Sequence, residues 1–202
     1  MKRSSILIIY TGGTIGMKTD EATGALVPFD FSGIYEEFPS LKRLKVDIEV
    51  LTIKPPIDSS NVSVENWVDM ARLIRDNYTK YDGFVVLHGT DTMSYSASAL
   101  SFMLEDLMKP VILTGSQLPI GALRTDGKEN IIPAIEIAAA KKPDGTPVVP
   151  EVCVFFHEKL MRGNRTTKVN SESFGAFGSN NYPLLAMAGT DIQFYTRNIR
   201  KY

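Results

Sequence analysis

The feature that most constrains the fold of this chain is a series of short runs in which the residues are all apolar or alternate between apolar and polar. Most of these runs are followed two residues later by glycine or proline. Runs of this length suit a strand, because a helix needs ten or more residues. They occupy residues 6–10, 46–53, 84–87, 111–113 and 152–156. Continuous apolar runs are typical of parallel strands that are covered on both faces. The sequence therefore predicts a buried, largely parallel sheet.

Helical patterns separate these runs. Apolar side chains recur at intervals of 3 and 4 over residues 63–78 and 93–107, and residues 131–140 are apolar and rich in alanine. Ser63 is the expected N-cap of the first helix, and Pro133 is tolerated if it lies in the first turn of the third. Strands that alternate with helices predict a doubly wound α/β fold with helices on both faces of the sheet.

Two segments do not fit this alternation. Residues 17–32 are polar with Gly24 and Pro28, and are interpreted as a mobile flap. Residues 170–202 are rich in glycine and asparagine and show little periodicity, so we expect irregular structure there.

Composition excludes several classes of protein. With 44% hydrophobic and 22% charged residues, the 202-residue chain has ordinary globular usage, which excludes disorder and fibres. A net charge of −1 gives no basic footprint for nucleic acid or an anionic membrane.

The run at residues 6–10 is too short for a signal-peptide core, and no run approaches the length of a membrane span. The single cysteine, Cys153, lies in an apolar run and is interpreted as buried. These observations predict a cytoplasmic protein.

Polar residues and glycines gather where three of the predicted strands end. The loops are residues 11–14, 88–91 and 114–117. In sheets of this kind, ligands bind beyond the carboxyl ends of the strands. We therefore expect the three loops to line one crevice.

Thr14 is a candidate nucleophile in the first of these loops. Gly12, Gly13 and Gly16 surround it, and glycines allow a sharp turn that leaves the hydroxyl exposed. A phosphate-binding loop or a purely structural turn are the alternatives. The G-G-x-x-G spacing differs from a dinucleotide fingerprint, and Lys54 stands where that motif needs an acidic residue.

Thr90, Asp91 and Lys168 form a second candidate set. Asp91 follows a buried strand and needs a partner, because an unpaired buried charge is costly. Lys168 is the expected partner. A hydroxyl is a weak nucleophile until a base or cation assists it, and a Thr–Lys–Asp set supplies that help. A salt bridge that only joins two loops explains the pattern equally well.

Ser59 and Ser60 follow the second strand, after Asp58. Successive hydroxyl and backbone N–H groups ahead of a helix suit a carboxylate ligand. A simple N-cap motif is the alternative, and the sequence favours it.

Taken together, four motifs resemble the bacterial-type L-asparaginase family, and in particular its cytoplasmic type I branch. They are residues 11–16 (TGGTIG), 88–93 (HGTDTM), 114–117 (TGSQ) and 162–168 (RGNRTTK). The resemblance implies the Rossmann/flavodoxin-like N-terminal domain of that family. It also implies an amidohydrolase that converts L-asparagine to L-aspartate and ammonia without a metal or cofactor.

The resemblance also implies roles for individual residues. Thr14 would attack the side-chain amide and form an acyl-enzyme, and Lys168 and Asp91 would polarise the hydroxyl of Thr90. Backbone N–H groups at the Thr90 loop would stabilise the oxyanion. The remaining substrate contacts would come from Asp91 to the α-amino group, Ser59 and Ser60 to the α-carboxylate, and the backbone of Ser116 to the leaving amide.

Two departures from the family pattern stand out. The flap of many members carries a tyrosine in a Gly-Tyr-x-Pro stretch, whereas residues 24–28 read GALVP. Tyr10 and Tyr35 are nearby in sequence, without a geometric case for either. Family chains also continue into a smaller domain. We therefore interpret residues 1–190 as the catalytic N-terminal domain and 191–202 as the start of a linker, and expect little or no turnover from this piece alone.

Two alternatives stay open. A glutamine-hydrolysing amidotransferase subunit shares the same four catalytic positions, although it carries an extra N-terminal domain. A non-catalytic fragment that serves as an assembly module is the other. In the full-length form, the resemblance implies a homodimer or homotetramer that acts on L-asparagine, with L-glutamine as the other candidate substrate.

Overall fold

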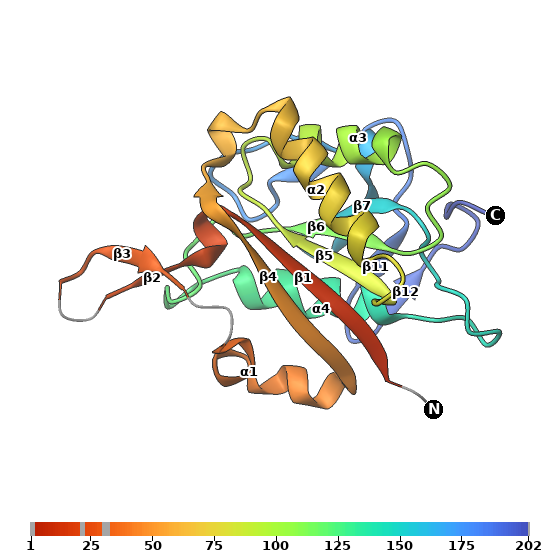
Figure 1. Ribbon diagram of the computed structural model, residues 1–202, viewed down its shortest axis with the longest axis horizontal. Coiled ribbons are helices and arrows are strands. Elements are labelled where there is room, and N and C mark those ends of the chain that lie inside the picture. Colours follow the sequence, from red (N-terminus) through yellow and green to blue (C-terminus); the bar gives the residue numbers. More distant parts are fainter. Residues whose placement is uncertain (1–2, 21–22, 30–32, 202) are drawn as a thin grey trace.

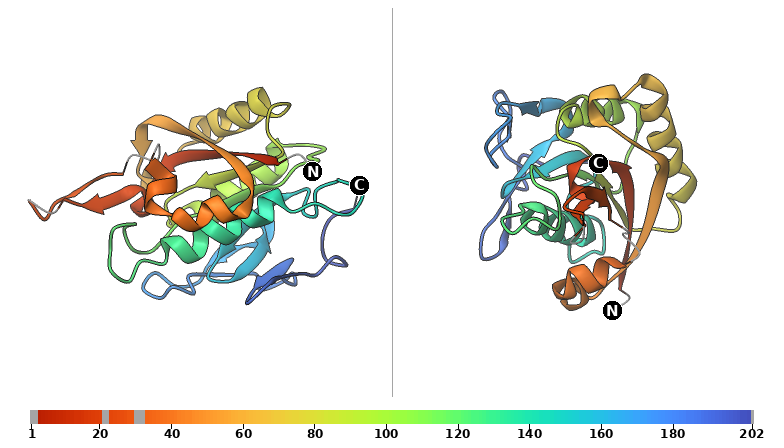
Figure 2. Two further views of the ribbon diagram at one scale, coloured as in Figure 1. Left: turned by 90° about the horizontal axis from the view of Figure 1, so that it is seen from below. Right: turned by 90° about the vertical axis from the view of Figure 1, so that its left-hand side faces the viewer.

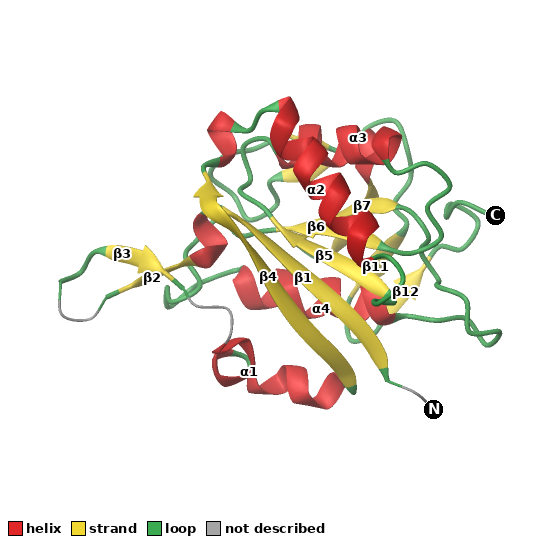
Figure 3. Ribbon diagram, viewed as in Figure 1, coloured by secondary structure: helices red, strands yellow, loops and turns green. Residues whose placement is uncertain are grey.

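The computed structural model describes residues 3–20, 23–29 and 33–201, and it centres on an eight-stranded sheet between helices (Figures 1 and 3). The strands are β1 (Ser4–Gly12), β4 (Val46–Ile57), β5 (Gly83–Leu87), β6 (Val111–Thr114), β7 (Val152–Phe156), β8 (Lys159–Arg162), β11 (Ala186–Ala188) and β12 (Ile192–Phe194). Their order in the sheet is β12-β11-β8-β7-β6-β5-β1-β4. The doubly wound α/β prediction is thereby confirmed.

The five strands expected from sequence form the parallel part of this sheet. β1 lies between β4 and β5, and β5, β6 and β7 follow in parallel register. The chain order 2-1-3-4-5 is that of flavodoxin-like folds, whose ligand site lies where the order reverses, between the first and third strands. β4 continues past Pro55 and Pro56, where the sequence indicated an end. It lies at the sheet edge, and an edge strand tolerates proline because one row of its backbone groups has no partner strand.

Helices cover both faces of the sheet, as Figure 2 shows. They are α1 (Ile34–Glu37), α2 (Val64–Asn77), α3 (Met93–Met103) and α4 (Gly127–Ala139). Ser63 forms the expected cap of α2, as half of a capping box with Asn66. α3 ends before the predicted boundary. α4 begins at Gly127, four residues before the apolar pattern, so Pro133 lies inside the helix and not in its first turn.

Alternate residues of β1 divide between two apolar cores. Ile6, Ile8 and Tyr10 pack with α1 and α4 on one face. Leu7 and Ile9 pack with α2 and α3 on the other. This two-sided burial explains why the strand reads as one continuous apolar run.

Residues 170–202 were expected to be irregular, but they add two strands to the sheet, so that expectation was wrong over β11 and β12. β8 pairs antiparallel with β7, β11 with β8, and β12 with β11. The β7–β8 turn holds His157 and Glu158 at φ 46° and 69°, the left-handed conformation of tight hairpins. Ile199 is buried beyond β12. The domain boundary at residue 190 stays a prediction.

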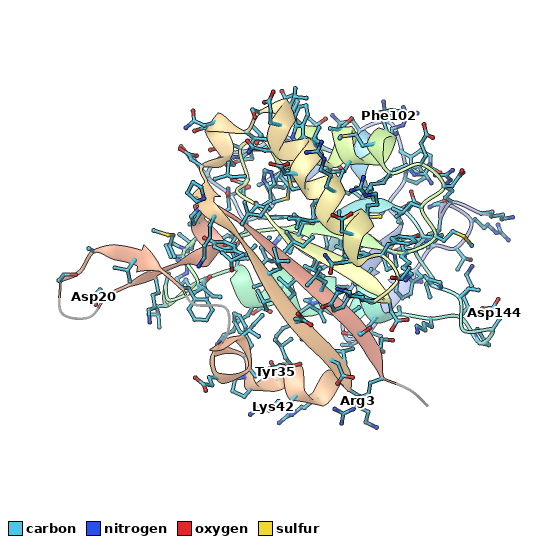
Figure 4. All side chains as sticks on the ribbon, viewed as in Figure 1. Arg3, Asp20, Tyr35, Lys42, Phe102 and Asp144 are labelled. Carbon is cyan, nitrogen blue, oxygen red and sulfur yellow. The ribbon has the colours of Figure 1, made fainter. Side chains whose placement is uncertain are left out.

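The predicted flap begins as a hairpin of β2 (Met17–Thr19) and β3 (Leu26–Pro28), which projects from the body in Figure 1. Asp20 lies toward its outer end in Figure 4. The hairpin is fastened at its base, where Phe29 donates its N–H to the Gly16 carbonyl at 2.7 Å and Ile120 donates to that of Met17 at 3.0 Å. Residues 21–22 and 30–32 of the predicted flap lie outside the described residues.

Within the described ranges, no helix combines the length and apolarity needed to cross a bilayer.

Candidate active site

Three loops meet at the carboxyl ends of β1, β4 and β5. A Cβ atom added to Gly13 would lie 2.5 Å from the Gly89 Cα, and one added to Gly89 would lie 2.4 Å from the Ser59 Oγ. Such approaches are possible only where the side chain is a hydrogen. The loop after β1 therefore packs directly on the loop after β5, which in turn packs on the segment after β4. This is the position where the strand order reverses.

Lys168 lies between the two polar side chains of the second loop. It belongs to β9 (Thr167–Lys168), which pairs with β10 (Phe177–Gly178). Its Nζ lies 2.9 Å from the Thr90 Oγ1 and 2.8 Å from the Asp91 Oδ1. The Lys168 side chain is 18% exposed, whereas that of Asp91 is 59% exposed and open toward solvent. Lys168 forms a salt bridge with Asp91 and also donates a hydrogen bond to the Thr90 hydroxyl. This geometry agrees with both interpretations made from sequence.

Thr14 begins the 3₁₀ turn Thr14–Gly16 that follows β1. Gly13 precedes it at φ 86°, and the Gly16 N–H closes the turn on the Gly13 carbonyl at 3.1 Å. Thr14 is exposed, whereas Ile15 is buried and anchors the turn. The contact between Gly13 and Gly89 brings this turn beside the loop that carries Thr90.

The two tyrosines near this turn differ in position. The Tyr10 hydroxyl lies directly beneath Gly16, where an added Cβ would be 2.0 Å away. Burial raises the pKa of Tyr10. The Tyr35 hydroxyl instead accepts the Ile48 N–H at 3.2 Å near the start of β4, and Figure 4 shows it by the lower helices. Tyr35 is therefore at the wrong end of the strand to meet Thr14.

The predicted carboxylate-binding segment is in part an N-cap. The Asp58 side chain accepts the Ser60 N–H at 3.0 Å and caps the turn Ser59–Asn61, which lowers the pKa of Asp58. That N–H is therefore occupied, while the Ser60 side chain is exposed. Ser59 is buried beneath Gly89, and its carbonyl accepts the Thr92 hydroxyl at 2.6 Å.

Ser116 is buried at the end of β6, and its hydroxyl donates to the Leu118 carbonyl at 2.5 Å. The hydroxyl hydrogen of Ser116 is therefore engaged within its own loop. The contact of its backbone with a leaving amide stays a prediction.

Sequence reasoning missed the group that holds this loop. The carboxylate of Asp126, just before α4, accepts the N–H groups of Gln117 at 3.0 Å and Leu118 at 3.1 Å. Asn130, one turn later, donates its side-chain amide to the Gly115 carbonyl at 3.0 Å and accepts the His157 N–H at 2.9 Å. An Asp four residues ahead of an Asn at a helix start, just after the 114–117 loop, was the available signal.

Across residues 3–20, 23–29 and 33–201, no group of three or more His, Cys, Asp or Glu side chains is placed to hold a metal ion.

The fold and the site together define a class: a flavodoxin-like α/β protein with two threonine loops and a lysine at its switch point. The sequence model described as "Asparaginase, N-terminal" matches residues 5–200. The chain belongs to the asparaginase family.

Named relatives agree with this assignment. The chain is 45% identical to L-asparaginase 1 of Escherichia coli, with 96% of the chain and 56% of that protein covered. It is 43% identical to the mouse 60 kDa lysophospholipase, with 97% of the chain and 37% of that protein covered. The crystal structure of L-asparaginase I from Vibrio cholerae superimposes with a TM-score of 0.85 at 43% identity, covering 98% of the chain and 57% of that structure. The chain thus spans roughly a third to just over half of the proteins that it matches.

Proposed function

We propose that the protein hydrolyses the side-chain amide of L-asparagine to L-aspartate and ammonia. The observation that carries the proposal is Lys168, whose Nζ is within hydrogen-bond distance of both Thr90 and Asp91 beside the turn of Thr14. Two hydroxyl groups and a lysine are what acyl transfer to water by a side-chain nucleophile requires.

In the first half-reaction, the Thr14 oxygen attacks the amide carbon and the hydroxyl proton passes to the departing nitrogen. The C–N bond breaks, ammonia leaves, and an ester joins Thr14 to the substrate. In the second half-reaction, water attacks the ester carbon, the ester C–O bond to Thr14 breaks, and a water proton returns to the Thr14 oxygen as aspartate is released. Thr90 assists these proton transfers, and Lys168, paired with Asp91, polarises its hydroxyl.

We expect the charged groups of the substrate to contact side chains of the same loops. The exposed carboxylate of Asp91 is available to the α-amino group. The exposed Ser60 side chain, beside buried Ser59, supports a contact with the α-carboxylate. The proposal includes self-association into dimers or tetramers in the cytoplasm, which sedimentation and cell fractionation test.

The deciding experiment compares Thr14→Ala with Thr79→Ala, an exposed threonine in the turn after α2. Ammonia release and covalent acyl-enzyme, detected by intact-protein mass spectrometry, are measured with L-asparagine. Acyl-enzyme detection needs only one turnover, so it suits a slow enzyme. We expect Thr14→Ala to lose both signals by several orders of magnitude and Thr79→Ala to keep them. Equal activity in the two variants would remove Thr14 as nucleophile.

Two further substrates separate the alternatives. L-Glutamine tests the amidotransferase interpretation, and lysophosphatidylcholine tests the activity in the name of the mouse relative. We expect L-asparagine to be preferred over both. Faster acylation by either competitor would replace the proposed substrate.

A further inference from the structure

His88 is a buried histidine that the proposed chemistry does not use. It follows β5 directly and is 1% exposed. Its Nδ1 lies 2.7 Å from the Gly89 carbonyl oxygen, and its Nε2 lies 2.9 Å from the Ser96 Oγ on α3. The Trp67 Nε1–H on α2 donates to the same Ser96 oxygen at 2.9 Å. Both ring nitrogens are therefore engaged.

The partners and the burial of His88 together set the direction of this chain of hydrogen bonds. A carbonyl oxygen only accepts, so Nδ1 must carry the proton toward Gly89. Burial lowers the pKa of His88, against the smaller opposing effect of its hydrogen bond to Gly89, and this favours the neutral ring. A neutral ring with its proton on Nδ1 has no proton on Nε2, so the Ser96 hydroxyl donates to Nε2 while its oxygen accepts the indole N–H of Trp67.

The peptide unit whose carbonyl oxygen, that of Gly89, is bonded to His88 also carries the N–H of Thr90. A trans peptide is planar, so its C=O and N–H point in opposite directions. Fixing the Gly89 oxygen on one side therefore fixes the direction of the Thr90 N–H on the other. The loop is also held tightly behind His88, because a Cβ added to Gly115 would lie 2.3 Å from the His88 carbonyl oxygen.

We propose that His88 is a positioning residue that, held in one tautomer by Ser96 and Trp67, aims the Thr90 N–H at the oxyanion formed during amide hydrolysis. This inference rests on the proposed function. An oxyanion donor acts mainly in the transition state, and losing one lowers kcat by about 10²- to 10³-fold. If the Thr90 N–H no longer points at the oxyanion, acylation should therefore be slower, while substrate binding should be nearly unchanged.

The first test compares His88→Leu with His88→Asn. Leucine removes the donor to Gly89, whereas the side-chain amide of asparagine places a donor near the position of Nδ1. We expect His88→Leu to slow acyl-enzyme formation by at least about tenfold with little change in the Kd for L-asparagine, and His88→Asn to recover most of the rate. Ser96→Ala should slow it by a smaller factor. Ser101→Ala is the control, because it removes from the same helix a hydroxyl that donates to the Ala97 carbonyl within that helix. Equal rates in His88→Leu and wild type, or no recovery in His88→Asn, would overturn the proposal.

The second test is independent of activity. Nitrogen-15 NMR of the imidazole reports its tautomer directly. We expect a neutral ring protonated at Nδ1 at pH 6. A ring protonated at Nε2, or an imidazolium at that pH, would overturn the arrangement even if acylation proceeds. If wild type forms no acyl-enzyme while the tautomer is as expected, the proposed function has failed and the role of His88 in aiming its oxyanion donor fails with it.

Discussion

Gly13 shows how one missing side chain shapes the site. Its φ of 86° and ψ of 172° lie in a region that is essentially restricted to glycine, at a cost of about 1–3 kcal/mol for other residues. A Cβ added to Gly13 would lie 2.5 Å from the Cα of Gly89. We therefore expect Gly13→Ala to combine backbone strain with a clash that separates the Thr14 turn from the Thr90 loop.

Gly24 offers a matched control for this prediction. It also has a positive φ, of 70°, but an added Cβ would meet nothing within 4 Å. Urea unfolding should show a larger loss for Gly13→Ala than for Gly24→Ala, for which strain alone costs at most about 1–2 kcal/mol. Acyl-enzyme formation should be lost only in Gly13→Ala. Equal effects in the two variants would mean that the loop contact contributes nothing.

At this scale, part of the site was predictable and part was not. The sequence paired Asp91 with Lys168, and the structure shows that pair, but the argument from burial was wrong because the Asp91 side chain is 59% exposed. The N-cap that the sequence favoured is present, because Asp58 accepts the Ser60 N–H. The sequence could not indicate that the Ser116 hydroxyl turns into its own loop. That outcome depends on a rotamer and on turn geometry, which one-dimensional spacing does not encode.

At the scale of the elements, residues at the start of α4 hold the loop that follows β6. The Asp126 carboxylate satisfies two backbone N–H groups of the loop after β6 and also accepts from Asn130 at 3.1 Å. Removing it leaves those groups without their charged acceptor, and such hydrogen bonds are worth about 1.5–3 kcal/mol. We expect Asp126→Ala to lose about 2–3 kcal/mol of unfolding free energy and to disorder the loop of Ser116.

The control for Asp126 is Asp144, labelled in Figure 4, which accepts from the Thr146 N–H at 2.9 Å in an exposed turn. Asp144→Ala should cost less than about 1 kcal/mol in urea unfolding, because water replaces the lost acceptor. Amide exchange of Gln117 and Leu118 should rise only in the Asp126 variant. Unchanged exchange there would contradict the role given to α4.

The elements themselves were predictable in proportion to their apolar pattern. β1, β5, β6 and β7 follow buried runs and have bounds within two residues of those expected. The start of α4 was missed because residues 127–130 are polar or glycine. β11 and β12 were missed because three-residue strands at a sheet edge carry too little periodicity to separate them from loop.

On the scale of the whole molecule, an ionic cluster around Glu151 holds the segment that follows β12 against the sheet. Glu151, 5% exposed, accepts from Arg162 Nε at 2.6 Å and from the Arg200 N–H at 2.8 Å. Arg162 also donates to the Asn198 carbonyl at 3.1 Å and lies 4.2 Å from the centre of the Tyr182 ring. Arg162 is the last residue of β8, and the chain runs from it to Lys168. The cluster therefore supports both this part of the sheet and the candidate active site.

Glu151→Ala should therefore act far beyond its own position. Removing one member of a buried ion pair costs about 3–5 kcal/mol, because the other charge is left uncompensated. Amide exchange should accelerate over residues 182–200 and acylation should slow as Lys168 loses its support. The control is Arg3→Ala, whose partner Asp47 lies 3.6 Å away with both side chains 64% exposed; such pairs contribute at most about 1 kcal/mol. Loss of stability in Glu151→Ala without faster exchange over 182–200 would show that this cluster stabilises only the strand ends and does not fasten the C-terminal segment.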